Sequence, residues 1–180
     1  MIEPRRVRVL FDEAQIAQRI EELAREIAAR KPKDLLVVAI LKGSFMFAAD
    51  LVRALHRAGL SPQMEFMHLS SYRAGTVSSG QVAILRDVES EVRDRVVMLV
   101  DDILESGRTI AFAKDLLAAR GAQVWTCCLL EKPNKRAVTV NPDFVGFECP
   151  DYFVVGYGMD VAHSFRELPY IGVVEAASPA

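Results

Sequence analysis

The sequence is poor in cysteine and histidine and lacks any long run of one charge. Its three cysteines, Cys127, Cys128 and Cys149, are odd in number and have no metal-ligand spacing. We therefore expect buried, reduced thiols and a cytoplasmic location. The 22 basic and 24 acidic residues give a net charge of -2, which disfavours a protein dedicated to nucleic-acid binding. Any anionic ligand is therefore expected to be bound by a small group of residues at one site and not by an extended basic surface.

Long hydrophobic runs are also missing. No apolar stretch approaches the length of a transmembrane helix, and the first residues, MIEPRRVRVLFDEAQ, contain no signal-peptide core. We expect no membrane partner. With 180 residues, 51% of them hydrophobic and 26% charged, the chain has the size and composition of one globular unit with one core. We predict a single domain over residues 1–180.

Strand and helix patterns alternate along the chain. Asp12 precedes a helical period that runs from residue 13 to about residue 30, and the apolar run at 35–41 is typical of a strand buried on both faces. Further strands are expected at 64–71, 82–88, 96–102 and 122–132, and helices after residue 42 and at 109–121. This order predicts an α/β fold with a central, mostly parallel sheet flanked by helices. The last third, with short runs at 143–147 and 152–157 between prolines, suggests a small strand-rich region.

The stretch VVMLVDDILESGRT, residues 96–109, carries the strongest chemical signal. An apolar strand runs directly into Asp101 and Asp102, at the strand end where open α/β sheets bind ligands. Carboxylates there suit sugar hydroxyls or a divalent cation. The Ser, Gly and Thr that follow, just before a helix, suit a phosphate. The alternative is a solvated acidic turn that caps the helix.

This stretch closely resembles the phosphoribosyl-pyrophosphate (PRPP) motif of the type I phosphoribosyltransferases. The segments LKGS (41–44), SSY (70–72), LLEKP (129–133), PDFVGFECPDYFVVGYGMD (142–160) and FRELPYIGVV (165–174) resemble, in family order, the branch that acts on 6-oxopurines. The resemblance covers most of the chain from residue 35 onward. It implies the family's sheet with a hood built mainly from residues 133–180 together with the N-terminal segment.

The resemblance also implies a reaction. A 6-oxopurine, hypoxanthine or guanine, and PRPP would give the nucleoside 5'-monophosphate and pyrophosphate, with Mg²⁺ as cofactor. Small-molecule substrates, no nucleic acid, and a homodimer or homotetramer are expected. Neither the choice among hypoxanthine, guanine and xanthine nor the oligomeric state can be read from the motifs.

Within the opening motif, the resemblance assigns Asp101 and Asp102 to the ribose hydroxyls, directly or through Mg²⁺. Glu105 stands where the family usually has aspartate, the proposed general base near N7 of the purine. Its added methylene changes the reach of the carboxylate, which matters for proton transfer. The residues expected to cradle the 5'-phosphate are Ser106, Gly107, Arg108 and Thr109.

Other motifs are assigned to the pyrophosphate. By resemblance, Leu41, Lys42 and Gly43 form its binding loop, with a non-proline cis peptide between the first two; an ordinary strand-to-helix turn is the alternative. Arg166 would grip the pyrophosphate and act in the chemistry with Glu105, and Asp160 would contact Mg²⁺. Without the other motifs, both would be surface charges.

The remaining motifs concern the lid and the purine. Ser71 and Tyr72 are expected in a flexible lid that excludes water, although the polar segment also suits a plain surface hairpin. Lys132 would donate to the purine O6 atom, a contact that favours 6-oxopurines over adenine. Phe153 would stack on the base while the backbone of Val154 faces its edge. The alternatives are a solvated lysine and a core phenylalanine.

Two other functions are compatible with parts of the pattern. A PRPP-sensing regulator that binds nucleic acid is disfavoured by the presence of Lys132 and Phe153 and by the negative net charge. A phospho-acceptor receiver domain also has an acidic pair at a strand end, but the pair would lie near the start of about 120 residues. His163 is a lone histidine, to which we assign no catalytic role.

Overall fold

The computed structural model describes residues 7–74 and 77–175. Its largest element is a six-stranded sheet in the order β4-β3-β2-β5-β6-β7. The pairing is parallel except between β3 and β4. The strands are β2 (Leu36–Leu41), β3 (Gln63–Ala74), β4 (Val77–Arg86), β5 (Val96–Leu104), β6 (Gln123–Glu131) and β7 (Phe144–Glu148). The predicted α/β class with a mostly parallel central sheet is confirmed.

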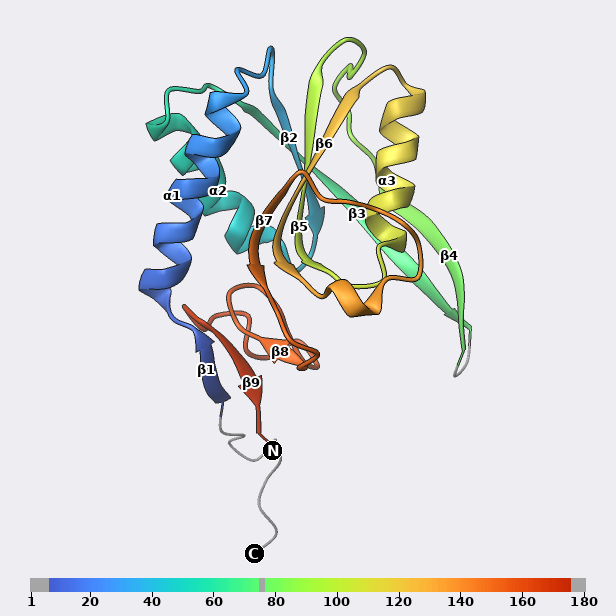
Figure 1. Cartoon of the computed structure of the whole chain (residues 1–180). Coiled ribbons are helices and arrows are strands. Elements are labelled where there is room, and N and C mark those ends of the chain that lie inside the picture. The colour runs from blue at the N-terminus through green and yellow to red at the C-terminus, as the bar shows by residue number, and fades with distance from the viewer. Residues whose placement is uncertain (1–6, 75–76, 176–180) are drawn as a thin grey trace, which may run out of the picture.

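Helices cover both faces of this sheet. The helices α1 (Glu13–Ala29) and α2 (Phe45–Arg57) lie on one face and α3 (Arg108–Ala119) on the other (Figure 1). Successive residues of β2 point to opposite faces, so Val37 packs with the α1 and α2 side while Val38 packs with the α3 side. This two-sided burial explains why the strand is apolar at every position.

The start of α1 is set by local hydrogen bonds. The Asp12 carboxylate accepts from the Gln15 backbone N–H at 2.8 Å, and the Gln15 side chain accepts from the Asp12 N–H at 2.9 Å. This capping box satisfies two N–H groups that a helix start leaves without partners. Among the described residues, no helix is long and apolar enough to cross a membrane.

A second, three-stranded sheet lies beyond the carboxyl ends of the central strands (Figure 1). It has the order β1-β9-β8, with β1 at Val7–Phe11, β8 at Val154–Val155 and β9 at Ile171–Val174, and both pairings are antiparallel. We had not predicted β1 from the sequence, because a five-residue segment has too short a pattern to identify. This small sheet forms the strand-rich hood.

The strand β7 differs from expectation. The run at 143–147 was expected in the strand-rich region, yet β7 pairs with β6 and extends the central sheet. Phe144 is buried, and its ring lies near Trp125 of β6, with ring centres 6.1 Å apart. The Arg19 side chain of α1 also donates to the carbonyls of Val145 and Gly146. These contacts join distant segments, so short-range patterns do not reveal them.

Candidate active site

A cleft of about 370 Å³ lies where the central strands end. It is lined by residues from six separate segments of the chain, which the fold brings to one edge of the sheet. Ten of the predicted site residues line it: Leu41, Lys42, Gly43, Asp102, Glu105, Lys132, Phe153, Val154, Asp160 and Arg166.

The two adjacent carboxylates lie near the end of β5, whose last residue is Leu104. Asp101 is buried, with 8% of its surface exposed, and Asp102 is half-buried. Burial raises the pKa of the Asp101 carboxyl well above its usual range, and the neighbouring Asp102 charge raises it further. Burial also raises the pKa of Asp102. Burial of two adjacent carboxyl groups is unfavourable for the free energy of folding. The pair is therefore better explained by a role in binding a ligand or a cation than by a solvated turn.

The loop after β2 packs directly on this pair. The Leu41–Lys42 peptide bond is cis, as predicted. A Cβ atom built on Gly43 would lie 1.8 Å from Asp102 Oδ2, so only glycine fits between the loop and the carboxylate. Lys42 is exposed at the cleft, and the buried Ser44 hydroxyl donates to the Ile40 carbonyl at 2.6 Å. The backbone of the loop is therefore fixed by packing and by a hydrogen bond, while the exposed Lys42 side chain can bind an anion in the cleft.

The segment that carries Asp160 and Arg166 closes the opposite wall. Arg166 Nη2 lies 2.8 Å from Asp160 Oδ1, and Nη1 donates to the Gly158 carbonyl at 2.6 Å. Gly158 has a φ of +98°, and a Cβ on it would lie 2.2 Å from the Gly43 carbonyl oxygen. His163 has a side chain that is 86% exposed, and it does not line the cleft.

The purine-side residues show unusual burial. Lys132 is only 6% exposed, so it is no solvated strand-terminal lysine, and its Nζ lies 3.4 Å from Glu105 Oε1. Phe153 is 62% exposed although it is aromatic, so it is not a core residue. The adjacent Val154 is buried in β8. A buried cation and an exposed ring that meet at one cleft suit a flat, polar-edged heterocycle.

The residues assigned to the phosphate, Ser106, Gly107, Arg108 and Thr109, do not line this cleft. Ser106 and Gly107 lie in the turn between β5 and α3, where Gly107 caps the helix with a φ of +80°, and Arg108 and Thr109 are the first residues of α3. The Ser106 carbonyl accepts from the backbone of Ala137 at 2.9 Å. The turn therefore presents the N-terminus of α3 beside the acidic pair, as an anion site requires.

The predicted lid segment is only partly described. Ser71 and Tyr72 belong to the backbone of β3, and residues 75–76 lie outside the described residues. The segment was expected as a loop, but its described part is antiparallel strand, in which Ser71 pairs with Val82. The β3 ladder continues past the buried sheet, which composition alone did not indicate.

Four residues of the cleft were missed by sequence reasoning: His68, Leu69, Ile103 and Met159. Ile103 and Met159 stand beside predicted residues and would follow from a wider reading of each motif. His68 and Leu69 belong to β3, where His68 pairs in register with Leu41. That register alone places them in the site, and it has no short-range signal.

The donor set fits magnesium. Mg²⁺ takes oxygen ligands and keeps several waters and substrate oxygens, so one or two protein carboxylates suffice. Asp101, Asp102 and Asp160 supply such oxygens at or beside the cleft. Within residues 7–74 and 77–175 no three His, Cys, Asp or Glu side chains converge as a closed metal site. The carboxylates therefore suit a metal that arrives with a phosphorylated substrate.

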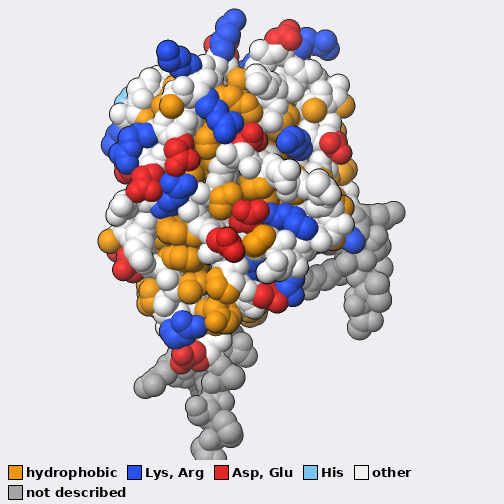
Figure 2. Space-filling view, in the orientation of Figure 1, with side chains coloured by type: hydrophobic (Ala, Val, Ile, Leu, Met, Phe, Trp, Pro, Cys, Tyr) orange, Lys and Arg blue, Asp and Glu red, His pale blue; other side chains and the backbone are white. Residues whose placement is uncertain are grey.

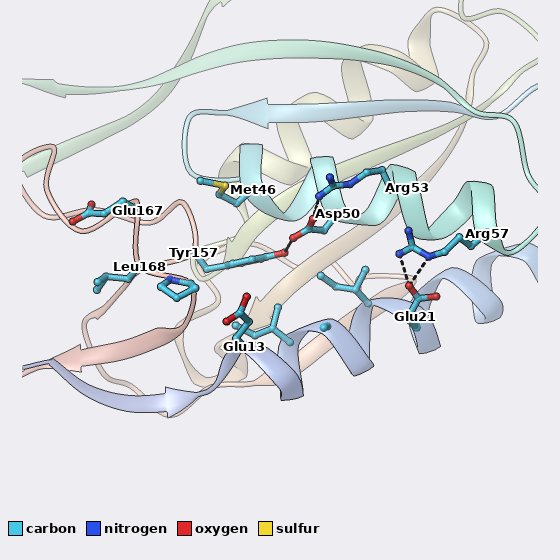
Figure 3. A pocket seen from close by; sticks show the side chains of 13 residues that line it. Glu13, Glu21, Met46, Asp50, Arg53, Arg57, Tyr157, Glu167 and Leu168 are labelled. Atoms are coloured by element: carbon cyan, nitrogen blue, oxygen red, sulfur yellow. Dashed lines mark hydrogen bonds and ion pairs between the residues drawn. The ribbon is translucent and has the colours of Figure 1, made fainter.

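A larger cavity, about 470 Å³, lies between α1, α2 and residues 157–169. Figure 3 shows some of its charged groups paired with one another, while Glu13 and Glu167 have no partner drawn. The Tyr157 hydroxyl donates to Asp50, Asp50 pairs with Arg53, and Arg57 pairs with Glu21. None of the predicted site residues lines it. Its larger volume alone therefore does not make it the site.

Comparisons with known proteins agree with this geometry. The family model described as a phosphoribosyl transferase domain matches residues 8–162. The chain is 42% identical to the hypoxanthine phosphoribosyltransferase of Escherichia coli K12, over 93% of this chain and 95% of that protein. A solved hypoxanthine phosphoribosyltransferase from Staphylococcus aureus is 38% identical, with a TM-score of 0.88 over 93% and 91% of the two chains. The Trypanosoma cruzi enzyme in complex with the product IMP is 35% identical, with a TM-score of 0.88 over 97% of each chain.

Proposed function

The chain belongs to the phosphoribosyltransferase family, in its hypoxanthine phosphoribosyltransferase branch, and we propose that the cleft described above transfers phosphoribosyl from PRPP to hypoxanthine. The products are IMP and pyrophosphate. One observation carries the proposal: residues of segments 41–43, 102–105, 132, 153–154 and 159–166 line a single cleft, and Asp101 directly precedes one of these segments. Each brings the residue type that one part of the two substrates needs.

The sugar end is held by the β5 carboxylates and the turn after them. Asp101 and Asp102 bind the ribose hydroxyls, because carboxyl oxygens accept hydrogen bonds from hydroxyl groups. The 5'-phosphate lies at the N-terminus of α3, against the turn residues Ser106 and Gly107 and the first helical residues Arg108 and Thr109. The sugar is thereby fixed at both ends, which sets the direction from which its C1 atom is attacked.

The pyrophosphate is held on the opposite side of C1. The backbone of Leu41 and Gly43, the Lys42 ammonium and the Arg166 guanidinium face it from two walls. The carboxylates of Asp160, Asp101 and Asp102 would hold Mg²⁺, which would supply positive charge to offset that of the leaving pyrophosphate. Asp160 also orients Arg166 through their ion pair.

The purine lies between Phe153 and the Lys132 side. The Lys132 ammonium donates to O6, and the Val154 backbone faces the base edge. The C1–N9 bond forms as the bond from C1 to pyrophosphate breaks, and the proton that leaves N7 passes to Glu105. A ring stacked on Phe153 is kept in line with C1, and a lid at Ser71 and Tyr72 excludes water from the reacting centre.

Further properties of the chain are proposed with it. All three cysteines are free and buried, and burial raises the pKa of each thiol, which suits a reducing cytoplasm. Basic and acidic side chains are interspersed on the face shown in Figure 2, so a small-molecule role without nucleic acid is favoured. We propose one domain over residues 1–180, acting as a homodimer or homotetramer.

The test is a panel of four bases. Purified protein is mixed with magnesium, PRPP and, separately, hypoxanthine, guanine, xanthine or adenine, and nucleotide formation is followed by absorbance. We expect turnover with hypoxanthine and none with adenine, and the guanine and xanthine reactions decide the preference at C2. If PRPP binds but no base turns over, the transferase proposal is wrong and the PRPP-sensing regulator takes its place.

A further inference from the structure

Arg136 lies outside the motifs that carry the family resemblance. Its side chain contacts the backbone of Glu105 and Lys132, two residues that line the cleft. Arg136 follows a short 3-10 helix, Pro133–Lys135, and is only 18% exposed in its side chain. Its Nη1 atom lies 2.8 Å from the Leu104 carbonyl oxygen, 2.9 Å from that of Glu105 and 3.4 Å from that of Lys132. Nη1 has two hydrogens for these three carbonyls, so the longer contact to Lys132 shares a hydrogen with one of the two shorter contacts.

These carbonyls lie at the point where the pairing between β5 and β6 ends. The β5–β6 ladder ends with Leu104 opposite Glu131. Glu105 and Lys132 are the next residues on the two strands, and both line the cleft. One ladder-like bond remains between the two segments, from the Lys132 N–H to the Leu104 carbonyl at 3.0 Å. No strand pairing fixes the backbone of Glu105 relative to Lys132.

We propose that Arg136 is a positioning residue for purine binding, which clamps the backbone of Glu105 to that of Lys132 and so sets the spacing of their side chains. This inference rests on the proposed function. The other guanidinium nitrogen, Nη2, pairs with the Glu131 carboxylate, which orients the fork from the β6 side. A guanidinium can join acceptors on two segments in one plane, whereas the single ammonium of lysine cannot.

The clamp has a consequence for the side chains it positions. Lys132 is buried, and Glu105 Oε1, at 3.4 Å, is its ion-pair partner among the described residues. A buried ammonium is stabilised by such a partner, so the direction in which Lys132 points depends on where Glu105 lies. Loosening the clamp therefore moves two purine contacts together and leaves the distant loop at 41–43 in place.

The experiment compares Arg136→Lys and Arg136→Gln with a matched control, Lys135→Gln. Lys135 is the neighbouring cation, with a half-exposed side chain that pairs with Asp151 at 2.7 Å. Dissociation constants are measured by calorimetry for IMP, which carries the purine, and for ribose 5-phosphate, which lacks it. We expect both Arg136 variants to weaken IMP binding about tenfold and ribose 5-phosphate binding less than about twofold. Lys135→Gln should match wild type.

The outcomes are separable. If both ligands weaken equally, or if IMP binding is unchanged in the folded Arg136→Lys variant, Arg136 does not position the purine subsite. Melting temperatures show whether Arg136→Gln folds, and the conservative lysine variant decides the question if it does not. A wild-type protein that fails to turn over any purine contradicts the proposed function itself, which is a different result from any difference among the variants.

Discussion

At position 105 a single methylene separates this chain from the family pattern. The longer glutamate carboxylate comes within 3.4 Å of the Lys132 ammonium, while its side chain remains 48% exposed. It therefore touches one proposed purine contact and still faces the space where N7 would lie. A carboxylate in that place has two uses, to orient Lys132 and to accept a proton.

Substitution of Glu105 separates these uses. We expect Glu105→Asp to keep activity and Glu105→Ala to lower kcat by about 100-fold, the lower range for loss of a general base. Steady-state kinetics with hypoxanthine provide the check. Equal kcat in the wild type and both variants would remove Glu105 from proton transfer.

Lys132 gives a second prediction. Lys132→Met keeps the length of the side chain and removes the charged donor, so KM for hypoxanthine should rise about tenfold while KM for PRPP stays within about twofold. Lys33→Met, at an exposed lysine away from the cleft, is the control. A parallel rise in both KM values would show that Lys132 acts on the whole site and not on the purine.

Residue identities were predictable from sequence only where a motif carried them. The acidic pair and the turn after it form a local pattern with a chemical meaning. The burial of Lys132 and the exposure of Phe153 depend instead on which segments fold over them, and His68 enters the cleft only through the register between β2 and β3. No spacing along the chain encodes these facts.

Between elements, two glycines meet closely in the site. Gly158 lies against the carbonyl of Gly43, so the segment with Asp160 and Arg166 packs on the loop at residues 41–43. Tyr157, next to Gly158, is tied to Asp50 of α2, the helix that follows that loop (Figure 3). The two walls of the cleft are thus joined twice.

The substitution Gly158→Ala, which adds one methyl group, tests this contact. In Gly158→Ala the new Cβ would meet the Gly43 carbonyl at 2.2 Å, so the walls must part, and we expect KM for PRPP to rise at least about tenfold. Gly59→Ala is the matched control, because Gly59 has a similar φ of +90° but no atom within 4 Å of the added Cβ. That variant should lose about 1 kcal/mol of stability and keep its kinetics. Identical KM values in the two variants would mean that the contact does not shape the site.

Helices and central strands were well predicted because their signals are local. Asp12 marked the start of α1, and apolar runs marked β2, β5 and β6. The strand β7 was assigned to the wrong sheet, and no strand was predicted at β1, although the resemblance assigned the N-terminal segment to the hood. Each of these strands is short and is defined by its partner rather than by its own pattern. The same reason limited the description of the hood.

In the whole molecule, one ion pair links the antiparallel edge of the sheet to the layer formed by α3. Arg120, at the end of α3, donates through both guanidinium nitrogens to Asp87, which follows β4. These bonds hold the pKa of the Asp87 carboxyl below its usual value. A lowered carboxyl pKa means that the unfolded chain binds the proton more readily, so the stabilisation is present at neutral pH and is lost as pH falls through the folded value.

Urea unfolding of Arg120→Gln tests this linkage. The variant should be less stable than the wild type at about pH 7, and the difference between the two should shrink as pH falls through the lowered pKa of Asp87, below which the carboxyl is protonated in both proteins. A difference that stays constant over this range would show that Arg120 acts through packing alone.

At this scale the sequence predicted the class of fold, because alternating strands and helices leave few topologies for a parallel sheet. It did not predict how the small sheet faces the large one. That arrangement depends on antiparallel pairing between β1 and β9, whose residues are separated by most of the chain.

The pairing of β1 with β9 also orders events during synthesis. Val7 of β1 has its partner, Val174, at the far end of the described chain, and β8 pairs with the same β9 strand. The residues of β1 leave the ribosome first, and their pairing strand, β9, is synthesised only near the end of the described chain. A nascent chain can complete the acidic pair and the turn before α3 well before Val154 is fixed beside them. The segments proposed to hold the sugar and the phosphate are therefore synthesised before the segment around Val154, which is proposed to receive the purine.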